Sequence, residues 1–300
     1  MPTATVAHPL GPPVVSGTTI TVDTMLQQPT RVTRLIMDLS LQRFIADRVF
    51  QSAGGVSGDA VVYDQATTNW LYADRDVQRV SPGAEFPLIT SSRPQPKLAT
   101  VEKWGGKVFV TDEARDRNNS ILLTNQLRQL TNTIIRKINA RAIAELEAAL
   151  ATFSSQVYTG HDWNAYQPGG TSPSALGASP LADLLFSQTQ ADRDELGVVY
   201  DTVLLNPLNL LRLNQVYGSG LVKGLEDLNM TLYSSNRVAV GTGYILASQQ
   251  VGELRVEQPL GTETWREQST QRNWIQSSVR PVMYVTNPYA VRKITGIGTS

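Results

Sequence analysis

The sequence predicts a mixed α+β fold, and three features support this prediction. A helical pattern runs from Thr111 to Phe153 without a Gly or a Pro. Short runs rich in β-branched and aromatic residues, such as 60–63 and 200–205, have the composition of strands. Residues 51–96 form a long stretch with a polar middle, which is typical of a projecting hairpin.

The long helix is the best-defined element of the pattern. Thr111 supplies an N-terminal cap, and Asp112 and Glu113 place negative charge at the positive end of the helix dipole. A turn near Arg117 and a second cap at 118–120 follow, and then apolar residues recur every three or four positions: Leu123, Leu127, Leu130, Ile134, Ile138, Ala142, Leu146 and Leu150. The uninterrupted part is about 50 Å long at 1.5 Å per residue. The alternative, a coiled-coil helix, lacks a second helix of matching length.

Composition excludes several classes of function. The chain has 26 Lys and Arg against 26 Asp and Glu, so no bulk attraction to nucleic acid or to an anionic membrane is indicated. It contains no Cys, so it has no disulfide and no thiolate ligand or nucleophile. Neither a membrane-spanning run nor a signal peptide is recognisable. Charged residues are only 17% of the chain and Arg outnumbers Lys, which favours a surface largely covered by other protein.

The first 96 residues are expected to form an arm and a hairpin. Residues 1–29 are rich in Pro and lack periodicity, so they need a neighbour to become ordered. An amphipathic helix is predicted from about Leu35 to Phe50. The runs 60–63 and 85–90 are predicted as the two strands of the hairpin.

The tip of this hairpin is the candidate interface. An isolated two-stranded hairpin is marginal in water, so we expect it to lie on another subunit, although an ordinary surface loop is the alternative. The candidate interface residues are Trp70, Tyr72, Asp74, Arg75, Asp76 and Arg79. The charges alternate in sign, which suits pairing with a neighbouring subunit.

After the hairpin the pattern predicts an α/β arrangement. A strand over 97–110 is expected to break at Gly105-Gly106. Ser179-Pro180 and Asn206-Pro207 each combine a cap with a proline at the first helical position, so two helices should begin there. Strands are expected over 200–205 and near four further segments: 243–247, 253–256, 280–286 and 291–294.

The sequence offers little that could perform chemistry. Its histidines are His8, in the arm, and His161, in a loop rich in Gly and Pro. A hydrolase that uses His161 as its base is therefore the only enzyme hypothesis, and the preferred expectation is no catalytic residue, no cofactor and no metal.

The order of these elements resembles that of the major capsid proteins of tailed bacteriophages, the Hong Kong 97 type of shell protein. Three motifs carry the resemblance, which extends from about 30 to 297: Val108-Phe109-Val110-Thr111-Asp112-Glu113, Val203-Leu204-Leu205-Asn206-Pro207 and Arg280-Pro281-Val282-Met283-Tyr284-Val285-Thr286-Asn287-Pro288. The resemblance implies the following division: an N-terminal arm (1–50), a hairpin called the E-loop (51–96), a peripheral domain with a spine helix at about 112–153 (97–198), an axial domain (199–275) and C-terminal strands that return to the peripheral domain (276–300).

The resemblance also implies a function. A major capsid protein assembles into pentamers and hexamers of an icosahedral virion shell around double-stranded DNA, in the cytoplasm of the bacterial host. Its partners are further copies of itself, a scaffolding protein, a portal and a decoration or cement protein. Contact with DNA should be weak and nonspecific, because the chain is neutral overall. The alternative in the same structural class is an encapsulin, a bacterial shell that encloses cargo enzymes.

One departure from the family's best-known member concerns covalent cross-linking. That chemistry joins a lysine of the E-loop to an asparagine of a neighbour. Residues 51–96 contain no Lys; their basic residues are Arg75, Arg79 and Arg93. A guanidinium stays protonated and cannot act as the nucleophile, so the shell is expected to be held without covalent cross-links.

Overall fold

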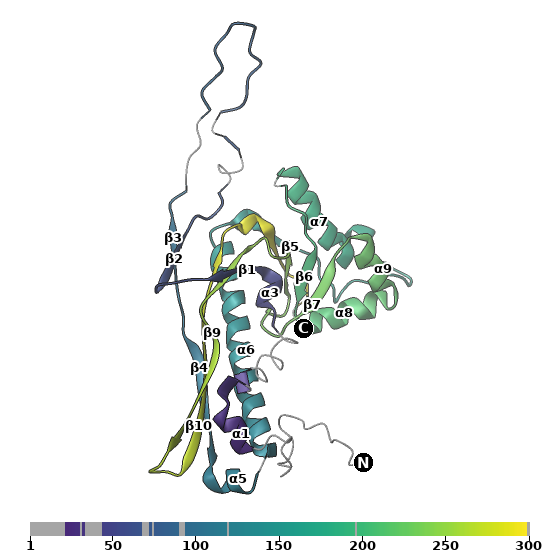
Figure 1. Cartoon of the computed structure of the whole chain (residues 1–300). Coiled ribbons are helices and arrows are strands. Elements are labelled where there is room, and N and C mark those ends of the chain that lie inside the picture. The colour runs from purple at the N-terminus through teal and green to yellow at the C-terminus, as the bar shows by residue number, and fades with distance from the viewer. Residues whose placement is uncertain are drawn as a thin grey trace, which may run out of the picture.

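A computed structural model gives the structure of the chain and confirms the mixed α+β fold (Figure 1). It describes residues 22–30, 32–33, 44–67, 72–73, 75–89, 94–118, 120–195 and 197–298. Most of the predicted arm, including residues 1–21, and most of the predicted helix after Leu35 lie outside these residues. The described part contains α1 (Val22–Gln27) and α3 (Ala46–Val49), and Phe50 already begins the first strand.

The predicted long helix is present as two successive helices, a short one and a long one. The Thr111 hydroxyl accepts a hydrogen bond from the Ala114 amide at 3.3 Å and caps α5 (Asp112–Asp116). A turn then leads into α6 (Ser120–Leu150), which has 31 residues and runs along the whole body of the molecule (Figure 1). The apolar side predicted from the sequence is buried, with Leu123, Leu127 and Leu146 fully inaccessible to solvent.

A four-stranded sheet lies along this helix in the order β1–β9–β10–β4. Its strands are β1 (Phe50–Gly55), β9 (Gly252–Glu267), β10 (Arg272–Val285) and β4 (Trp104–Thr111). β1 is parallel to β9, and the other two pairs are antiparallel. β9 and β10 are much longer than the predicted strands, because each continues as a ribbon along α6 (Figure 1).

The Gly105-Gly106 pair does not break the strand, so this prediction is wrong. Both residues lie inside β4, and the interruption falls at 101–103, between β3 and β4. A Cβ atom on Gly105 would lie 2.5 Å from the Ser277 carbonyl oxygen, and one on Gly106 would lie 2.7 Å from the Leu130 side chain. These glycines allow the strand to lie close to β10 on one side and to α6 on another.

The second sheet has five strands in the order β5–β11–β8–β6–β7. They are β5 (Val157–Thr159), β11 (Val291–Thr295), β8 (Thr242–Leu246), β6 (Thr202–Leu205) and β7 (Thr231–Ser234). β6 occupies an interior position of the sheet, and all four of its residues are buried. This agrees with the prediction of a buried strand over 200–205, which ends in the apolar run Val203-Leu204-Leu205.

Three helices accompany the second sheet, and two of them begin where the sequence predicts. α7 (Pro180–Arg193) is capped by the Ser179 hydroxyl, and α8 (Pro207–Tyr217) by the Asn206 side chain. α8 ends at Gly218, whose φ of 52° is in the left-handed region that favours glycine. α9 (Gly220–Asp227) follows directly, and single turns of 3-10 helix complete the body: η1 (Ser154–Gln156), η2 (Leu176–Ala178) and η3 (Pro288–Ala290).

The hydrophobic core is continuous from α6 to the second sheet. Its largest cluster combines α6 residues from Leu130 onward with β6, β8 and β11. A smaller cluster at the beginning of α6 is closed by α1 through Val22 and Leu26, which pack with Leu123, Leu127 and Ile275. The long helix therefore contributes side chains to both hydrophobic clusters, along most of its length.

Strand pairing groups some segments differently from the expected division of the chain. Residues 252–275, expected in the axial domain, pair with β1 and β4 beside α6. β11, expected to return to the peripheral domain, pairs with β8 and β5 of the second sheet. β1, expected in the E-loop hairpin, belongs to the four-stranded sheet. Such long-range pairing depends on the register between distant segments, which local composition does not reveal.

Candidate assembly interfaces

The hairpin projects well beyond the body of the molecule (Figure 1). Its base is formed by β2 (Ala60–Tyr63) and β3 (Lys97–Thr100), which pair antiparallel. The described residues beyond the base, up to Ile89, contain no strand, so the prediction of a strand at 85–90 is wrong for 85–89. A β-type composition supplies no ladder by itself, because strand hydrogen bonds need a partner in register.

One face of the hairpin base packs on the body, and the other carries bare apolar side chains. Tyr63 stacks on Tyr284 of β10 with ring centroids 4.6 Å apart. Val62 and Leu98 are direct cross-strand partners, and they are 68% and 65% exposed. Two apolar side chains directly opposite each other on a sheet are normally covered by further protein. No described residue of the single chain covers these two.

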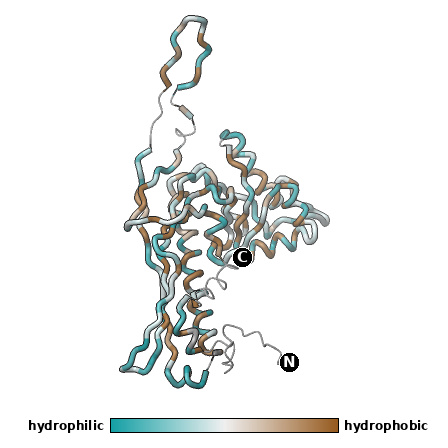
Figure 2. Tube along the Cα trace, in the orientation of Figure 1, coloured by the Kyte–Doolittle hydropathy of each residue, from teal (hydrophilic) through white to brown (hydrophobic). Residues whose placement is uncertain are grey.

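Further apolar side chains are exposed along the projecting loop. Phe86 is 81% exposed, and Val77, Leu88 and Ile89 are also exposed. Figure 2 shows hydrophobic stretches alternating with hydrophilic ones along the projecting loop. Burying a Val, Leu or Phe side chain stabilises by roughly 1.5–3 kcal/mol. Several large apolar side chains exposed on one projecting segment support a protein–protein interaction site there.

Four of the six candidate tip residues are described, and Trp70 and Asp74 lie outside the described residues. The Tyr72 hydroxyl donates a hydrogen bond of 2.6 Å to the Glu195 carbonyl oxygen, just after α7. Arg75, Asp76 and Arg79 are exposed, and no ion pair joins them to another described residue. Tyr72 thus forms its hydrogen bond within its own chain. The pairing of the charged residues with a neighbour stays a prediction.

A second surface, which the sequence analysis missed, is an aromatic row across the four-stranded sheet. The row consists of Trp265 on β9, Trp274 on β10 and Phe109 on β4, and the register places Trp274 directly opposite each of the other two. Trp265 and Trp274 are stacked at 6.3 Å, and Trp274 and Phe109 are tilted at 5.3 Å. The alternation of residues along each strand indicates which side chains point to the same face of the sheet. It does not reveal the register of the three strands, and the register decides which side chains become neighbours.

Polar groups hold the aromatic row in place. The Lys107 ammonium lies 4.5 Å from the centroid of the Trp274 ring, and the Arg272 guanidinium lies 4.5 Å from that of Phe109. The Trp274 indole N–H donates a 2.8 Å hydrogen bond to Glu267. That hydrogen bond, together with those from Thr270, lowers the pKa of the Glu267 carboxyl. The row lies on the face of the sheet that turns away from α6, because the alternate residues Asn273, Ile275 and Ser277 are buried.

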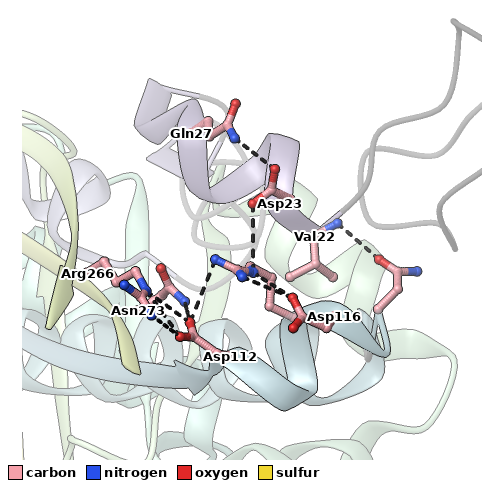
Figure 3. A network of polar contacts seen from close by, with 9 residues as sticks. Val22, Asp23, Gln27, Asp112, Asp116, Arg266 and Asn273 are labelled. Atoms are coloured by element: carbon pink, nitrogen blue, oxygen red, sulfur yellow. Dashed lines mark hydrogen bonds and ion pairs between the residues drawn. The ribbon is translucent and has the colours of Figure 1, made fainter. Parts of the chain in front are cut away.

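A polar network secures the beginning of the long helix (Figure 3). The Asp112 carboxylate accepts hydrogen bonds from Arg266 and from Asn273 at 2.8 Å, and hydrogen bonds from Arg266 lower the pKa of Asp112. Arg115 lies between Asp116 at 3.0 Å and Asp23 of α1 at 3.9 Å. The network joins α1, α5 and both strands of the ribbon, which are far apart in the sequence.

The His161 region is a set of side chains joined by hydrogen bonds between a loop and α7. His161 Nδ1 lies 2.7 Å from Asp183, a buried carboxylate that also accepts a hydrogen bond from the Trp163 indole at 2.8 Å. The nearby hydroxyls of Tyr158 and Ser187 bond to each other at 2.7 Å and to the Asp183 carbonyl, and no described hydrogen bond joins either to His161. Asp183 therefore acts as a structural acceptor that joins the loop to α7.

The described residues also contain no candidate metal centre, since no three His, Cys, Asp or Glu side chains are grouped to hold an ion. Within the same residues, no helix has the length and apolar character that crossing a membrane requires. These findings concern only the described part of the chain.

Comparisons with known proteins identify the family. The family of phage capsid proteins matches residues 94–294. A virus-like particle from Pyrococcus furiosus is 12% identical, with a TM-score of 0.59 over 89% of this chain and 99% of that one. A chain of Mycobacterium phage Bobi is 14% identical, with a TM-score of 0.58 over 86% and 89%. A chain from the capsid of the cyanophage P-SCSP1u is 13% identical, with a TM-score of 0.57 over 84% and 86%. No curated protein matches the sequence.

The structural likenesses, all at low identity, confirm the expected Hong Kong 97-like capsid fold. The family match extends from the end of the hairpin to β11 and includes α6, every strand of the second sheet and every strand of the four-stranded sheet except β1, which is more than half of the chain. Family membership also indicates a structural role for the chain. The chain therefore belongs to the phage capsid protein family and is a major capsid protein, a subunit of a capsid shell.

Proposed function

We propose that copies of this chain form pentamers and hexamers of an icosahedral shell that encloses double-stranded phage DNA. The observation that supports this assembly is the projecting hairpin, which holds exposed apolar side chains away from its own body. Such an arm gains stability only when another protein covers it. In a shell built from one chain, the protein available to every hairpin is a neighbouring copy.

The proposed division of labour follows the strand pairing. Residues of the hairpin beyond β1 act as the E-loop that reaches a neighbour. The four-stranded sheet and α6 form a peripheral domain that spans much of the subunit. Residues 199–251, with β6, β7, β8, α8 and α9, form an axial domain that packs around five-fold and six-fold axes, and the pairing of β9 supports a boundary near 252.

The exposed helices of the axial domain are suited to that packing. α8 presents Leu208 and Leu211 to solvent, and α9 presents Val222, all more than half exposed. These positions lie on helices whose opposite sides are buried through Leu213 and Leu225. Apolar residues on the outer side of two adjacent helices support contact with the same domain of the next subunit around an axis.

The wider assembly includes partners that recognise other parts of the subunit. A scaffolding protein, a portal and a decoration or cement protein accompany assembly in the host cytoplasm. The aromatic row on the outer face of the sheet supports docking of a cement protein, because aromatic side chains held by polar neighbours are typical anchors of an interface.

The test is assembly of the purified chain, measured by electron microscopy of negatively stained, concentrated protein. Wild-type protein should form closed particles, and Phe86→Asp should abolish them, because the substitution places a charge in the contact of the hairpin with its neighbour. Leu176→Asp is the matched control, since Leu176 is 85% exposed on η2, outside the hairpin. Equal particle yields for the two variants would contradict the proposal, and so would wild-type protein that never forms particles.

An encapsulin-type compartment is the second candidate, and the likeness to the virus-like particle of Pyrococcus furiosus favours keeping it. The two functions differ in what the shell contains. Particles purified from the native source should contain DNA that nuclease digests only after the shell has been opened, if the phage function holds. Particles that contain a single cargo enzyme and no DNA would favour the compartment instead.

A further inference from the structure

A polar cavity of about 570 Å³ lies on the side of α6 that turns away from the four-stranded sheet. Its walls come from the segment that contains α3, from the middle of α6 and from the loop that begins at the end of β7. Residues 132 and 136 of α6 line it, whereas Leu127, which packs with Ile275 of β10, and Leu130, which lies against Gly106 of β4, are a third to half a turn away around the helix. The cavity therefore opens on a different surface from the aromatic row.

The charged groups that line this cavity all have one sign. Arg48, Arg136 and Arg237 line it and are exposed, and no carboxylate is among the lining residues that the structure describes. Asp47 precedes Arg48 in the chain but does not line the cavity. In a chain of zero net charge, three cations without an acid at one cavity are a local concentration that composition alone does not predict.

Other side chains shape and orient the cavity. Arg48 lies over the ring of Tyr233, with 5.3 Å from the guanidinium carbon to the ring centroid. Asn132 and Asn236 add amide groups to the wall. The buried Asn139 accepts a hydrogen bond from the Ile45 amide at 3.1 Å, which fixes the segment of Arg48 against α6. Guanidinium and amide donors around a fixed hollow are the groups that bind phosphate oxygens.

The cationic character continues along the same side of α6. From Ser120 to Ile143 the helix contains no Asp or Glu, and of its cations Arg128 is the one near the face of Arg136, whereas Arg141 lies elsewhere on the helix and pairs with Glu102 and Glu145. Arg128 lies eight residues before Arg136, so the two are close to the same helical face. A phosphate bound in the cavity could therefore belong to a longer strand that also passes Arg128.

We propose that this cavity binds phosphodiester groups of double-stranded DNA, and that the surface on which it opens lines the interior of the shell. The inference rests on the proposed function, because it takes the DNA that the shell encloses as the ligand. Three arginines that bind phosphate make contact at defined positions without reading the sequence. Contact with the enclosed DNA is then local, through one site on each subunit, although the chain as a whole is neutral.

The test compares two variants that each lose three positive charges. Arg48→Gln, Arg136→Gln and Arg237→Gln together remove the cavity cations. Arg117→Gln, Arg193→Gln and Lys223→Gln remove three exposed cations elsewhere. The probe is a fluorescently labelled DNA duplex of about 20 base pairs, whose anisotropy is measured with unassembled subunits at several salt concentrations. Circular dichroism confirms that each variant is folded.

The cavity variant should bind the duplex at least about tenfold more weakly than wild type, and the control variant less than about threefold more weakly. The slope of log K against log salt should decrease in magnitude by about 2 to 3 in the cavity variant, since each lost phosphate contact contributes about 0.9. Arg136→Gln alone should weaken binding by a smaller factor, which keeps the test valid if the triple variant is unfolded. Equal losses in both triple variants, or no binding by wild type, would overturn the proposal.

Two further experiments distinguish a DNA site from a site for small anions, and the cavity proposal from the proposed shell. Inorganic phosphate, titrated by calorimetry, distinguishes a site for small anions: wild type that binds phosphate but not the duplex would overturn the assignment to DNA. Electron microscopy of the same variants separates this inference from the proposed function. Particles that form normally while DNA binding is unchanged in the cavity variant would refute the site alone. Wild-type subunits that bind DNA through the cavity but never form particles would refute the shell alone.

Discussion

The strands at the base of the hairpin and strand β6 of the second sheet are both rich in apolar residues but have opposite environments. Every residue of β6 is buried, whereas no residue of β2 or β3 is. β6 has hydrogen-bonded neighbours on both sides, and β2 and β3 have only each other. The body of the subunit thus completes its packing within one chain, while the hairpin requires a second chain. Folding and assembly should therefore depend on different residues.

The largest expected effect on folding comes from the body. Leu204→Ala should lower the free energy of unfolding by about 2–5 kcal/mol, because it leaves a cavity where a fully packed side chain stood. Leu98→Ala, on β3, should change it by less than about 0.5 kcal/mol, because that side chain is exposed in the single chain. Chemical denaturation of unassembled subunits measures both.

Particle yield should fall in Leu98→Ala even though the free energy of unfolding hardly changes. The variant should unfold like wild type yet form fewer particles, because the lost side chain contributes only at the contact with a neighbour. Equal destabilisation by Leu98→Ala and Leu204→Ala would show that the hairpin belongs to the folding unit and would end the distinction between the two regions.

Acid should lower the stability of the body of the subunit by protonating Asp112. Because the pKa of Asp112 is lowered in the folded state, its contribution to stability is complete above the unfolded-state value near 4 and is lost as pH falls through the lowered folded value. Asp112→Asn should therefore be less stable than wild type at neutral pH, and the difference should shrink in strong acid. Thermal melts of both proteins across this range provide the measurement, and a difference independent of pH would contradict the assignment.

A smaller effect on folding is expected from the charges of the hairpin. Arg75→Glu with Arg79→Glu should leave the melting temperature of the unassembled subunit nearly unchanged, because exposed ion pairs contribute under about 1 kcal/mol each. Particle yield should fall, because both charges are reversed at the proposed contact. Arg117→Glu with Arg193→Glu is the matched control outside the hairpin, and normal yield from the hairpin variant would refute the role of these charges.

No covalent cross-linking between subunits is expected on maturation. The hairpin lacks lysine over 51–96, and Lys97 at its base hydrogen-bonds to Gln65 of the same chain. Mature particles boiled in detergent should give a single band near 32.8 kDa on a denaturing gel. A ladder of covalent oligomers would show that another lysine forms cross-links, and the hairpin contact would then not need to hold the shell by apolar burial alone.

The sequence by itself determined the elements whose signals are local. Thr111, Ser179 and Asn206 begin helices where predicted, because a side chain that caps free amides acts within three residues of itself. The spacing of Leu123, Leu127 and Leu130 defined the buried side of α6 for the same reason: helical neighbours are set by distance along the chain. The order of such elements was also sufficient to indicate the capsid fold.

Only the tertiary structure decided the features that join distant segments. The glycines of β4 are strand residues because Ser277 and Leu130 approach them, and residues 85–89 form no strand because no described partner pairs with them. The row of Trp265, Trp274 and Phe109 depends on the register of three strands. The cavity of Arg48, Arg136 and Arg237 depends on how α3, α6 and the loop after β7 pack together. Each involves residues far apart in sequence, whose proximity is set by packing and pairing of the whole chain and not by any local pattern.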